Sequence, residues 1–159
     1  MIDPVIIKHF LIQSETFEMS LRLVLAIVLG MLIGAEREHK GKAAGLRTYT
    51  LVSLGAALFT VISIQAYSAY PSVNGVPGYD YHLIANIVVG IGFLGAGLIV
   101  FKENKVLGLT TAAGMWVTAA IGIAAGMGFN SVAIFSTVLV LLVFWALRRL
   151  EKQIPRAEK

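Results

Sequence analysis

The chain has 159 residues, of which 57% are hydrophobic and 14% are charged, a composition that excludes an ordinary soluble domain and predicts an integral membrane protein. The formal net charge of +4 does not indicate a nucleic-acid-binding protein, because the charged residues lie between long hydrophobic runs. Without cysteine, the chain can form no disulfide, thiolate metal site or cysteine nucleophile.

The first predicted span covers residues 20–35. Residues 1–19 mix charged and apolar side chains, and we expect them to form a short interfacial helix. Arg22 should snorkel to the interface at the start of the span. Gly30 and Gly34 form a GxxxG pair, which predicts a face for close helix packing.

The second predicted span covers residues 46–67 and lies between two different loops. Residues 36–47 are dense in charge, whereas residues 68–80 contain prolines, glycines and tyrosines but no lysine or arginine. The later loop is therefore predicted to be a turn-rich segment at the membrane interface.

The third predicted span, residues 82–101, contains Gly90, Gly92, Gly95 and Gly97. At about 100° per residue, Gly90 and Gly97 fall on one side of a helix, while Gly92 and Gly95 fall on the other. Because glycine lets neighbouring backbones approach closely, we expect this helix to be the centre of a small bundle. The alternative is that the glycines loosen or break the helix, as in the discontinuous helices of transporters.

Residues 106–147 carry no charge and are long enough for two further spans. Turn-forming residues at 126–130 divide them into spans over residues 109–125 and 131–150. Small residues recur at every fourth position of the fourth span and predict packing against the third span. They are Thr110, Gly114, Thr118, Gly122 and Gly126. The fifth span should face lipid, and a short basic tail, residues 151–159, follows it.

The basic residues predict the topology of an all-α membrane protein with five transmembrane helices in one domain, residues 1–150. Eleven of the 13 lysines and arginines fall in residues 36–47, 102–105 and 148–159. If the chain crosses the membrane five times, these three segments lie on the same side of it. By the positive-inside rule, the N-terminus is outside and the C-terminus is cytoplasmic. We expect the tail to lie against anionic lipid rather than nucleic acid.

Polar residues on the predicted cytoplasmic side are expected to form one cluster. The helix dipole disfavours a negative charge at the end of the first span, so Glu36 should pair with Arg37, Arg47 or a helix start. The threonines that begin the fourth span are also candidate N-caps. The cluster is either a structural network of ion pairs and caps or a ligand site. Its predicted members are Glu36, Arg37, Glu38, Arg47, Thr48, Thr110 and Thr111.

Asn86 is the most conspicuous polar side chain within a span, and it should face the bundle or a partner subunit, because an unpaired amide is costly in hydrocarbon. Trp116 is expected to pack in the core rather than to constrict a pore. His9, His39 and His82 have no metal-like spacing, so we predict no metal site and no cofactor.

Five sequence blocks, in order and at suitable spacing, resemble the MgtC/SapB family of bacterial inner-membrane proteins. They are LGMLIGAERE (residues 29–38), AGLRT (44–48), LGAALF (54–59), GIGFLGAG (90–97) and GLTTAA (108–113) with Trp116. The resemblance covers roughly residues 20–130 and implies a multi-pass protein of five helices in the bacterial inner membrane.

The resemblance also implies a role. The family is associated with growth under magnesium limitation, survival of pathogens inside macrophages (virulence) and inhibition of the F-type ATP synthase. Its motif blocks would contain Glu36, Arg37, Arg47, Asn86 and Thr110 of this sequence.

This chain departs from the family pattern in two respects. Many members carry a soluble cytoplasmic C-terminal domain, whereas we expect this chain to be a short form without it. Glutamine is more usual at the position of Asn86, and a small hydroxyl residue at that of Val89.

Among three functional classes, an enzyme has the least support, because no Ser/His/Asp arrangement, paired catalytic carboxylates or phosphate-binding loop occurs. A cation or small-solute channel or transporter is the alternative, although no acidic residue lies in the middle of a span. We predict a regulatory membrane protein that forms homo-oligomers or binds another membrane complex such as the F-type ATP synthase.

Overall fold

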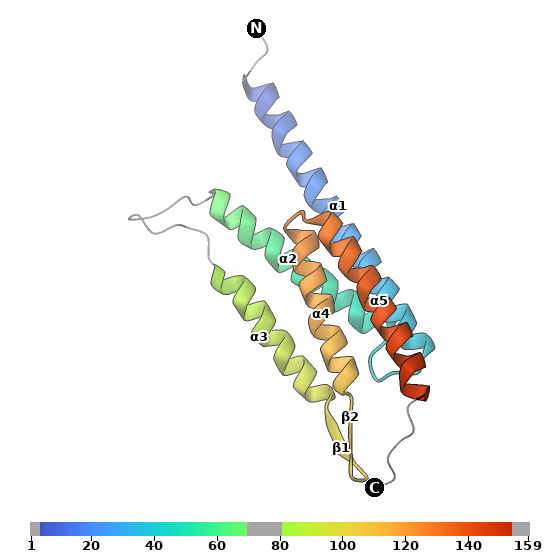
Figure 1. Ribbon diagram of the computed structural model, residues 1–159. Coiled ribbons are helices and arrows are strands. Elements are labelled where there is room, and N and C mark those ends of the chain that lie inside the picture. Colours follow the sequence, from blue (N-terminus) through green and yellow to red (C-terminus); the bar gives the residue numbers. More distant parts are fainter. Residues whose placement is uncertain (1–3, 70–80, 154–159) are drawn as a thin grey trace.

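The structure is a computed structural model that describes the backbone of residues 4–69 and 81–153 and the side chains of residues 15–66 and 83–150. Its described part contains five helices and one short β hairpin (Figure 1). In chain order these are α1 (Pro4–His39), α2 (Leu46–Ala69), α3 (Tyr81–Leu98), β1 (Val100–Lys102), β2 (Lys105–Leu107), α4 (Leu109–Gly126) and α5 (Asn130–Gln153). The predicted loop at residues 68–80 lies largely outside the described residues.

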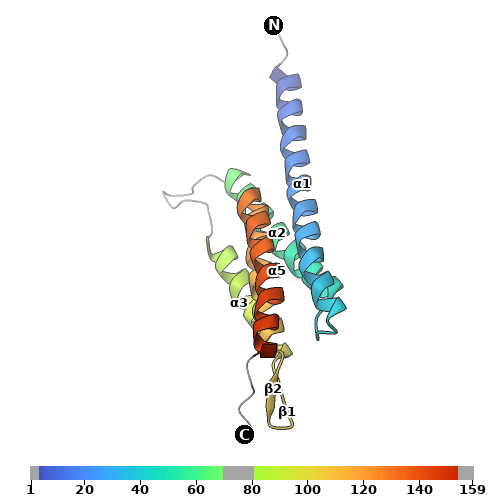
Figure 2. The same ribbon diagram turned by 45° about the vertical axis from the view of Figure 1, so that its right-hand side comes forward.

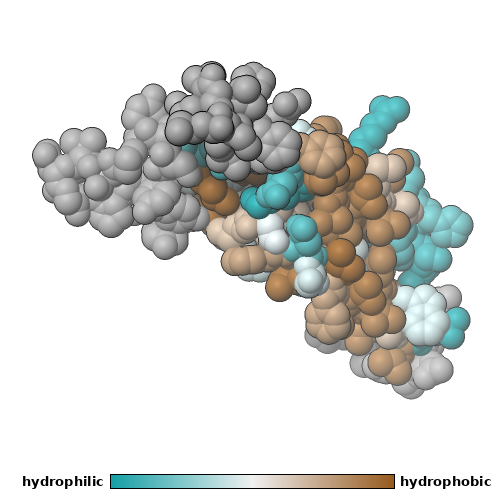
Figure 3. Space-filling view, turned by 90° about the horizontal axis from the view of Figure 1, so that it is seen from above, coloured by the Kyte–Doolittle hydropathy of each residue, from teal (hydrophilic) through white to brown (hydrophobic). Residues whose placement is uncertain are grey.

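The described helices have the lengths and composition of a membrane protein. Four of them contain segments long and apolar enough to cross a bilayer. These segments are Glu15–His39, Leu46–Ala66, Leu109–Gly126 and Asn130–Leu150. The apolar part of α3, Leu83–Leu98, is shorter. Apolar side chains cover much of the described surface in Figure 3, as expected for an all-α protein whose solvent is lipid.

Most of the described lysines and arginines belong to elements that lie at one end of the molecule. Figure 1 shows the α1–α2 turn, the β hairpin and the last turns of α5 together at this end. We call it the basic end. The start of α3 and the α4–α5 turn lie at the opposite end, and Figure 2 shows α1 extending beyond the other helices there.

Helix α4 is the centre of the bundle, because it contacts α1, α2, α3 and α5. Half of its span is buried, at 50%, against 11% for the span of α5. The glycines of α4 allow this packing. A Cβ at Gly122 would overlap the carbonyl oxygen of Ser53 in α2, and one at Gly126 would lie 2.7 Å from the oxygen of Ala57.

Helix α1 packs against α2 through its GxxxG pair. A Cβ at Gly30 would lie 2.8 Å from Ser53 Cβ, and one at Gly34 would lie 2.8 Å from Leu46 Cα. Both distances are too short for any larger side chain, so close approach of the two backbones requires glycine at both positions.

The prediction that the glycine-rich third helix is the centre is wrong. Gly95 is buried against Ala112 of α4, where a Cβ added to Gly95 would lie 3.5 Å from Ala112 Cβ, but a Cβ added at Gly90, Gly92 or Gly97 would meet no described atom within 4 Å. The physical reason is that α2 occupies the glycine face of α4. Helix α3 therefore packs on the flank of α4, and its outer face, with Phe93 81% exposed, is open.

The boundaries of two other predicted elements also change. Residues 4–39 form one continuous helix, so no separate interfacial helix precedes the first span. Helix α3 ends at Leu98 rather than at residue 101, and it does not break at its glycines. The strands pair antiparallel around Glu103 and Asn104, whose φ angles of 50° and 60° are those of a tight hairpin turn.

Glycine is required at two positions between helices, Gly108 after the β hairpin and Gly128 in the α4–α5 turn. At Gly108, φ is 89°, and a Cβ would overlap the carbonyl oxygen of Leu98, so the hairpin can close onto the end of α3 only through glycine. At Gly128, φ is 83°, and the amide of Phe129 donates to the oxygen of Ala124 at 2.9 Å. This is a Schellman-type helix end, and it lies within the predicted break at residues 126–130.

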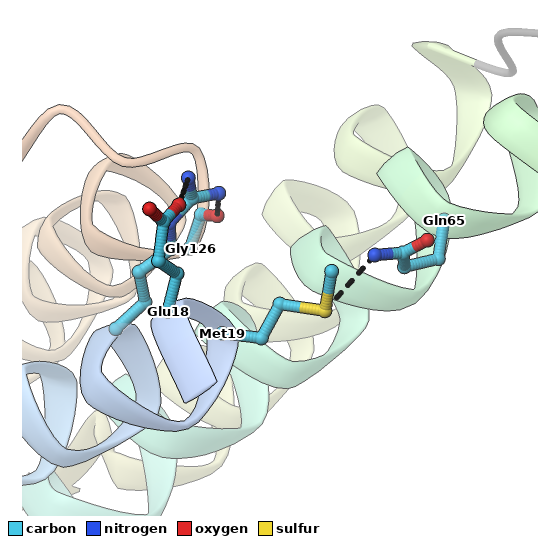
Figure 4. Close-up of polar contacts among 5 residues, drawn as sticks. Glu18, Met19, Gln65 and Gly126 are labelled. Atoms are coloured by element: carbon cyan, nitrogen blue, oxygen red, sulfur yellow. Dashed lines mark hydrogen bonds and ion pairs between the residues drawn. The ribbon is translucent and has the colours of Figure 1, made fainter. Parts of the chain in front are cut away.

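Arg22 joins α1 to the end of α4. Its Nη1 donates to the carbonyl oxygen of Gly126 at 3.4 Å, and its Nη2 lies 3.9 Å from Glu18 (Figure 4). Nearby, Gln65 Nε2 lies 2.9 Å from Met19 Sδ, which joins α2 to α1. Trp116 is 50% exposed, so its predicted core position is wrong.

The α2–α4 contact predicts the outcome of substituting Gly122. In Gly122→Ala, the new methyl group meets the backbone of Ser53, and overpacking of this kind typically costs about 1–3 kcal/mol of unfolding free energy. The measurement is denaturant unfolding in detergent micelles. Gly92→Ala, which adds a methyl group to open space, is the matched control, and equal stability of the two variants would contradict the packing described.

Candidate functional site

The residues of the predicted polar cluster do not form one site, because four of them line two different grooves and three line neither. Arg37 and Thr110 line a groove between α4 and α5, whereas Arg47 and Thr48 line a groove between α2 and α3. Glu36, Glu38 and Thr111 line neither groove. The structure therefore separates residues that the sequence predicted to form one cluster.

Glu36 forms an ion pair with Arg37 at the end of α1. Arg37 donates a hydrogen bond from Nε to Glu36 Oε2, and its Nη2 forms an ion pair with the same oxygen. The Arg37 side chain is only 3% exposed. The guanidinium carbon lies 3.7 Å from the ring centroid of Phe144 in α5. Because Phe144 and the carboxylate hold the same cation, this contact joins the last turn of α1 to α5.

Glu38 caps the next helix. Its Oε2 accepts a hydrogen bond from the backbone amide of Leu46 at 2.8 Å, which satisfies one free amide at the start of α2 and places a negative charge at the positive end of the helix dipole. Gly45 permits this contact, because a Cβ there would overlap the same carboxylate oxygen. For Glu38 the geometry therefore favours the structural interpretation of the cluster.

The two threonines at the start of α4 have different environments, and neither caps the helix. The N-cap position is Gly108, which makes no side-chain cap, so the prediction of threonine caps is wrong. Thr111 is buried, and its carbonyl oxygen accepts a hydrogen bond from the hydroxyl of Tyr49 at 3.0 Å. Thr110 is exposed in the α4–α5 groove.

The α2–α3 groove has a volume of about 760 Å³, within the range of about 300–1,000 Å³ that is typical of ligand sites. Arg47 and Thr48 lie at its basic end, and Asn86 lies toward the opposite end. The remaining wall is apolar. It is formed by Leu51, Val52, Gly55, Ala56, Phe59, Leu83, Ile87, Gly90, Ile91, Leu94, Leu98 and Met115, with Ala43 and Ala44 at the turn.

Both walls of this groove contain a glycine, where no side chain covers the backbone. Gly55 of α2 and Gly90 of α3 line it, and a Cβ at either position would meet no described atom within 4 Å. Asn86 is exposed on the same wall and makes no hydrogen bond to another described residue. An unpaired amide at membrane depth is costly, so this wall is suited to a polar partner group.

The α4–α5 groove has a volume of about 500 Å³ and is also lined by residues outside the predicted polar cluster. Lys42 and Arg148 join Arg37 along its lining, and Phe144 lies beside them. The sequence does indicate that Phe144 and Arg148 share one face of α5, because they are four residues apart. The partners of that face on α4 and α1 could be found only from the fold.

Comparison with known proteins gives a consistent family. A sequence model of the MgtC family matches residues 23–153. The chain is 42% identical over 128 residues to Escherichia coli YhiD, whose name describes a candidate magnesium transporter. It is 38% identical over 153 residues to SrpB of Synechococcus elongatus and 40% identical over 138 residues to MgtC of Salmonella typhimurium.

The extent of these matches differs among the relatives. The aligned part covers 80% of this chain and 60% of YhiD, 90% and 82% for SrpB, and 87% and 56% for MgtC. The chain thus spans less than two thirds of the length of YhiD and MgtC. No solved structure matches the fold.

The buried ion pair predicts an asymmetric effect of two glutamate substitutions. Glu36→Gln leaves the buried Arg37 without its counter-charge, and removal of one partner of such a pair costs about 3–5 kcal/mol of unfolding free energy. Glu38→Gln keeps an oxygen that can accept from Leu46 and should cost about 1 kcal/mol or less. Denaturant unfolding in micelles compares them, and a Glu38→Gln loss as large as that of Glu36→Gln would contradict the assignment.

Proposed function

The chain belongs to the MgtC family of multi-pass bacterial inner-membrane proteins, and we propose that it is a regulatory protein that binds a transmembrane helix of its target. The family is a membrane-protein family rather than an enzyme family, and the names of its members include a link to magnesium. As the family resemblance implies, we expect the protein to act as a regulator when magnesium is limiting.

The proposed topology has five membrane spans within residues 1–150, the N-terminus outside and the C-terminus with its tail, residues 151–159, in the cytoplasm. Its support is the grouping of basic residues. The α1–α2 turn, the β hairpin and the last turns of α5 lie at one end of the molecule (Figure 1), and all three carry lysine or arginine. The positive-inside rule assigns such an end to the cytoplasm.

The single observation that carries the proposed function is the open α2–α3 groove. Its walls are apolar, and Gly55 and Gly90 would let the backbone of a third helix approach from either side. Helices associate in lipid through close packing and interhelical hydrogen bonds. Asn86 supplies an amide that can form such a bond inside the groove.

Two occupants suit this groove. A helix of another membrane complex is the occupant that a regulator requires, and the family resemblance favours the F-type ATP synthase as that complex. A second copy of the chain would give a homo-oligomer through the same walls. A soluble C-terminal domain is not required for either contact, since both use membrane residues.

The groove predicts that blocking it abolishes regulation. In Gly90→Leu, a leucine side chain enters the groove, and its Cβ meets no described atom within 4 Å, so the fold should be retained. We expect loss of inhibition of ATP-driven proton pumping in liposomes that contain this protein and the F-type ATP synthase, because the leucine occupies the place of the target helix.

Gly92→Leu is the matched control, since Gly92 lies on the same helix, is equally free of neighbours and does not line the groove. It should inhibit pumping as wild type does. Inhibition by Gly90→Leu at the wild-type level would exclude the groove as the binding site, and absence of inhibition by the wild type would exclude this target.

Transport is the second candidate function, favoured by the name of YhiD. The α2–α3 groove has Arg47 as its one charged residue and no carboxylate among the described residues that line it, and the described side chains contain no group of three metal-binding residues. We therefore expect no magnesium flux into dye-loaded liposomes that contain the wild-type protein. A flux that Arg47→Gln abolishes would instead establish transport, since Arg47 lines the groove.

A further inference from the structure

The α4–α5 groove combines an apolar channel with cations at one end. Val117 of α4 and Leu139, Val140 and Val143 of α5 form its apolar part. Lys42, at the α1–α2 turn, and Arg148, near the end of α5, lie at the basic end together with Thr110. None of the described residues that line the groove is acidic.

The charges at this end are not balanced within the described part of the chain. Glu36 offsets only Arg37, and Glu38 is engaged at Leu46. Lys42 and Arg148 form no ion pair with any described residue, which leaves an excess of two positive charges. The nearby start of α4 adds to it, because an uncapped helix N-terminus carries partial positive charge.

We propose that this groove is a binding site for one anionic phospholipid. The headgroup phosphate lies between Lys42 and Arg148, near Arg37 and the hydroxyl of Thr110, and an acyl chain follows the apolar wall. From Thr110 to Val117 this wall extends about 10 Å along α4, at about 1.5 Å per residue. A phospholipid supplies both the charge and the hydrocarbon that the lining requires, whereas an apolar helix supplies only the second.

Phe144 links the two parts of the site. Its ring carries the Arg37 guanidinium on one face, and its Cζ would lie only 2.9 Å from a Cβ added to Gly114. The absence of a side chain at Gly114 therefore lets Phe144 pack against α4, and both residues line the groove. The bound lipid would contact α4, α5 and the α1–α2 turn at once and hold these segments together.

The test is native mass spectrometry of the full chain, titrated in detergent with phosphatidylglycerol, phosphatidylcholine or inorganic phosphate. We expect a one-to-one complex with phosphatidylglycerol, at least about tenfold tighter than with phosphatidylcholine, and no saturable binding of phosphate. In Lys42→Gln with Arg148→Gln, affinity for phosphatidylglycerol should fall about 25-fold, on the scale of about fivefold per cation.

The control removes two cations from the same segments but outside the groove. Lys40 lies two residues before Lys42, and Arg149 follows Arg148 but stacks on Trp145 at 4.2 Å from the ring centroid. At about 0.15 M salt, Lys40→Gln with Arg149→Gln should change the affinity less than about threefold, because more distant charges are screened.

A third variant, Val143→Trp, fills the apolar part while keeping every cation, and it should also weaken lipid binding at least tenfold. Val143 is half exposed, so this change does not disturb the core. Equal losses in the site and control charge variants, equal affinity for the two lipids, or saturable phosphate binding would overturn the proposal. So would Val143→Trp that binds phosphatidylglycerol as wild type does.

Discussion

The bundle depends on one close contact, where the backbone of α4 at Gly122 meets the backbone of α2 at Ser53. In lipid, helices gain nothing from hiding apolar side chains, so contact area and hydrogen bonds decide which faces pair. Gly126 extends the α4 side of this contact, and Gly30 brings α1 against Ser53 from the other side. Three helices thus meet near one serine, and the other two are arranged around them.

The open groove between α2 and α3 follows from this arrangement. Since the glycine face of α4 is occupied by α2, α3 can reach α4 only on its flank, through Gly95 and Ala112. The hairpin after Leu98 holds the end of α3 beside the start of α4. Gly90 therefore lines an open groove. A helix from outside the chain could pack closely against the backbone at this glycine.

Much of the fold followed from the sequence, because hydrophobic length and turn residues are local signals. The helices at residues 46–69, 109–126 and 130–153 begin and end close to their predicted limits. The choice of central helix did not follow. Glycine content shows that a helix face can approach another helix closely, but it does not show which helix will pack there. In the structure, Gly122 of α4 contacts α2, whereas a Cβ at Gly92 of α3 would meet no described atom within 4 Å.

The candidate site was predictable in its residue types but not in its grouping. Glu36 and Arg37 are adjacent in sequence, and their pairing was within reach of a local argument. Arg47 and Arg37 line different grooves, which only the fold reveals. Lys42 and Arg148 are 106 positions apart, and no local pattern relates them.

The central claim, that α3 lies on α4 with an open groove toward α2, can be tested directly because the chain has no native cysteine. Two paired variants in lipid nanodiscs, Gly95→Cys with Ala112→Cys and Gly55→Cys with Gly90→Cys, would be exposed to a mild oxidant. The first pair should form an intramolecular disulfide, since a 3.5 Å separation of the Cβ positions suits one, and the second pair should remain reduced. Closure of the 55–90 pair as readily as the 95–112 pair would show that α2 and α3 pack together and would contradict the account.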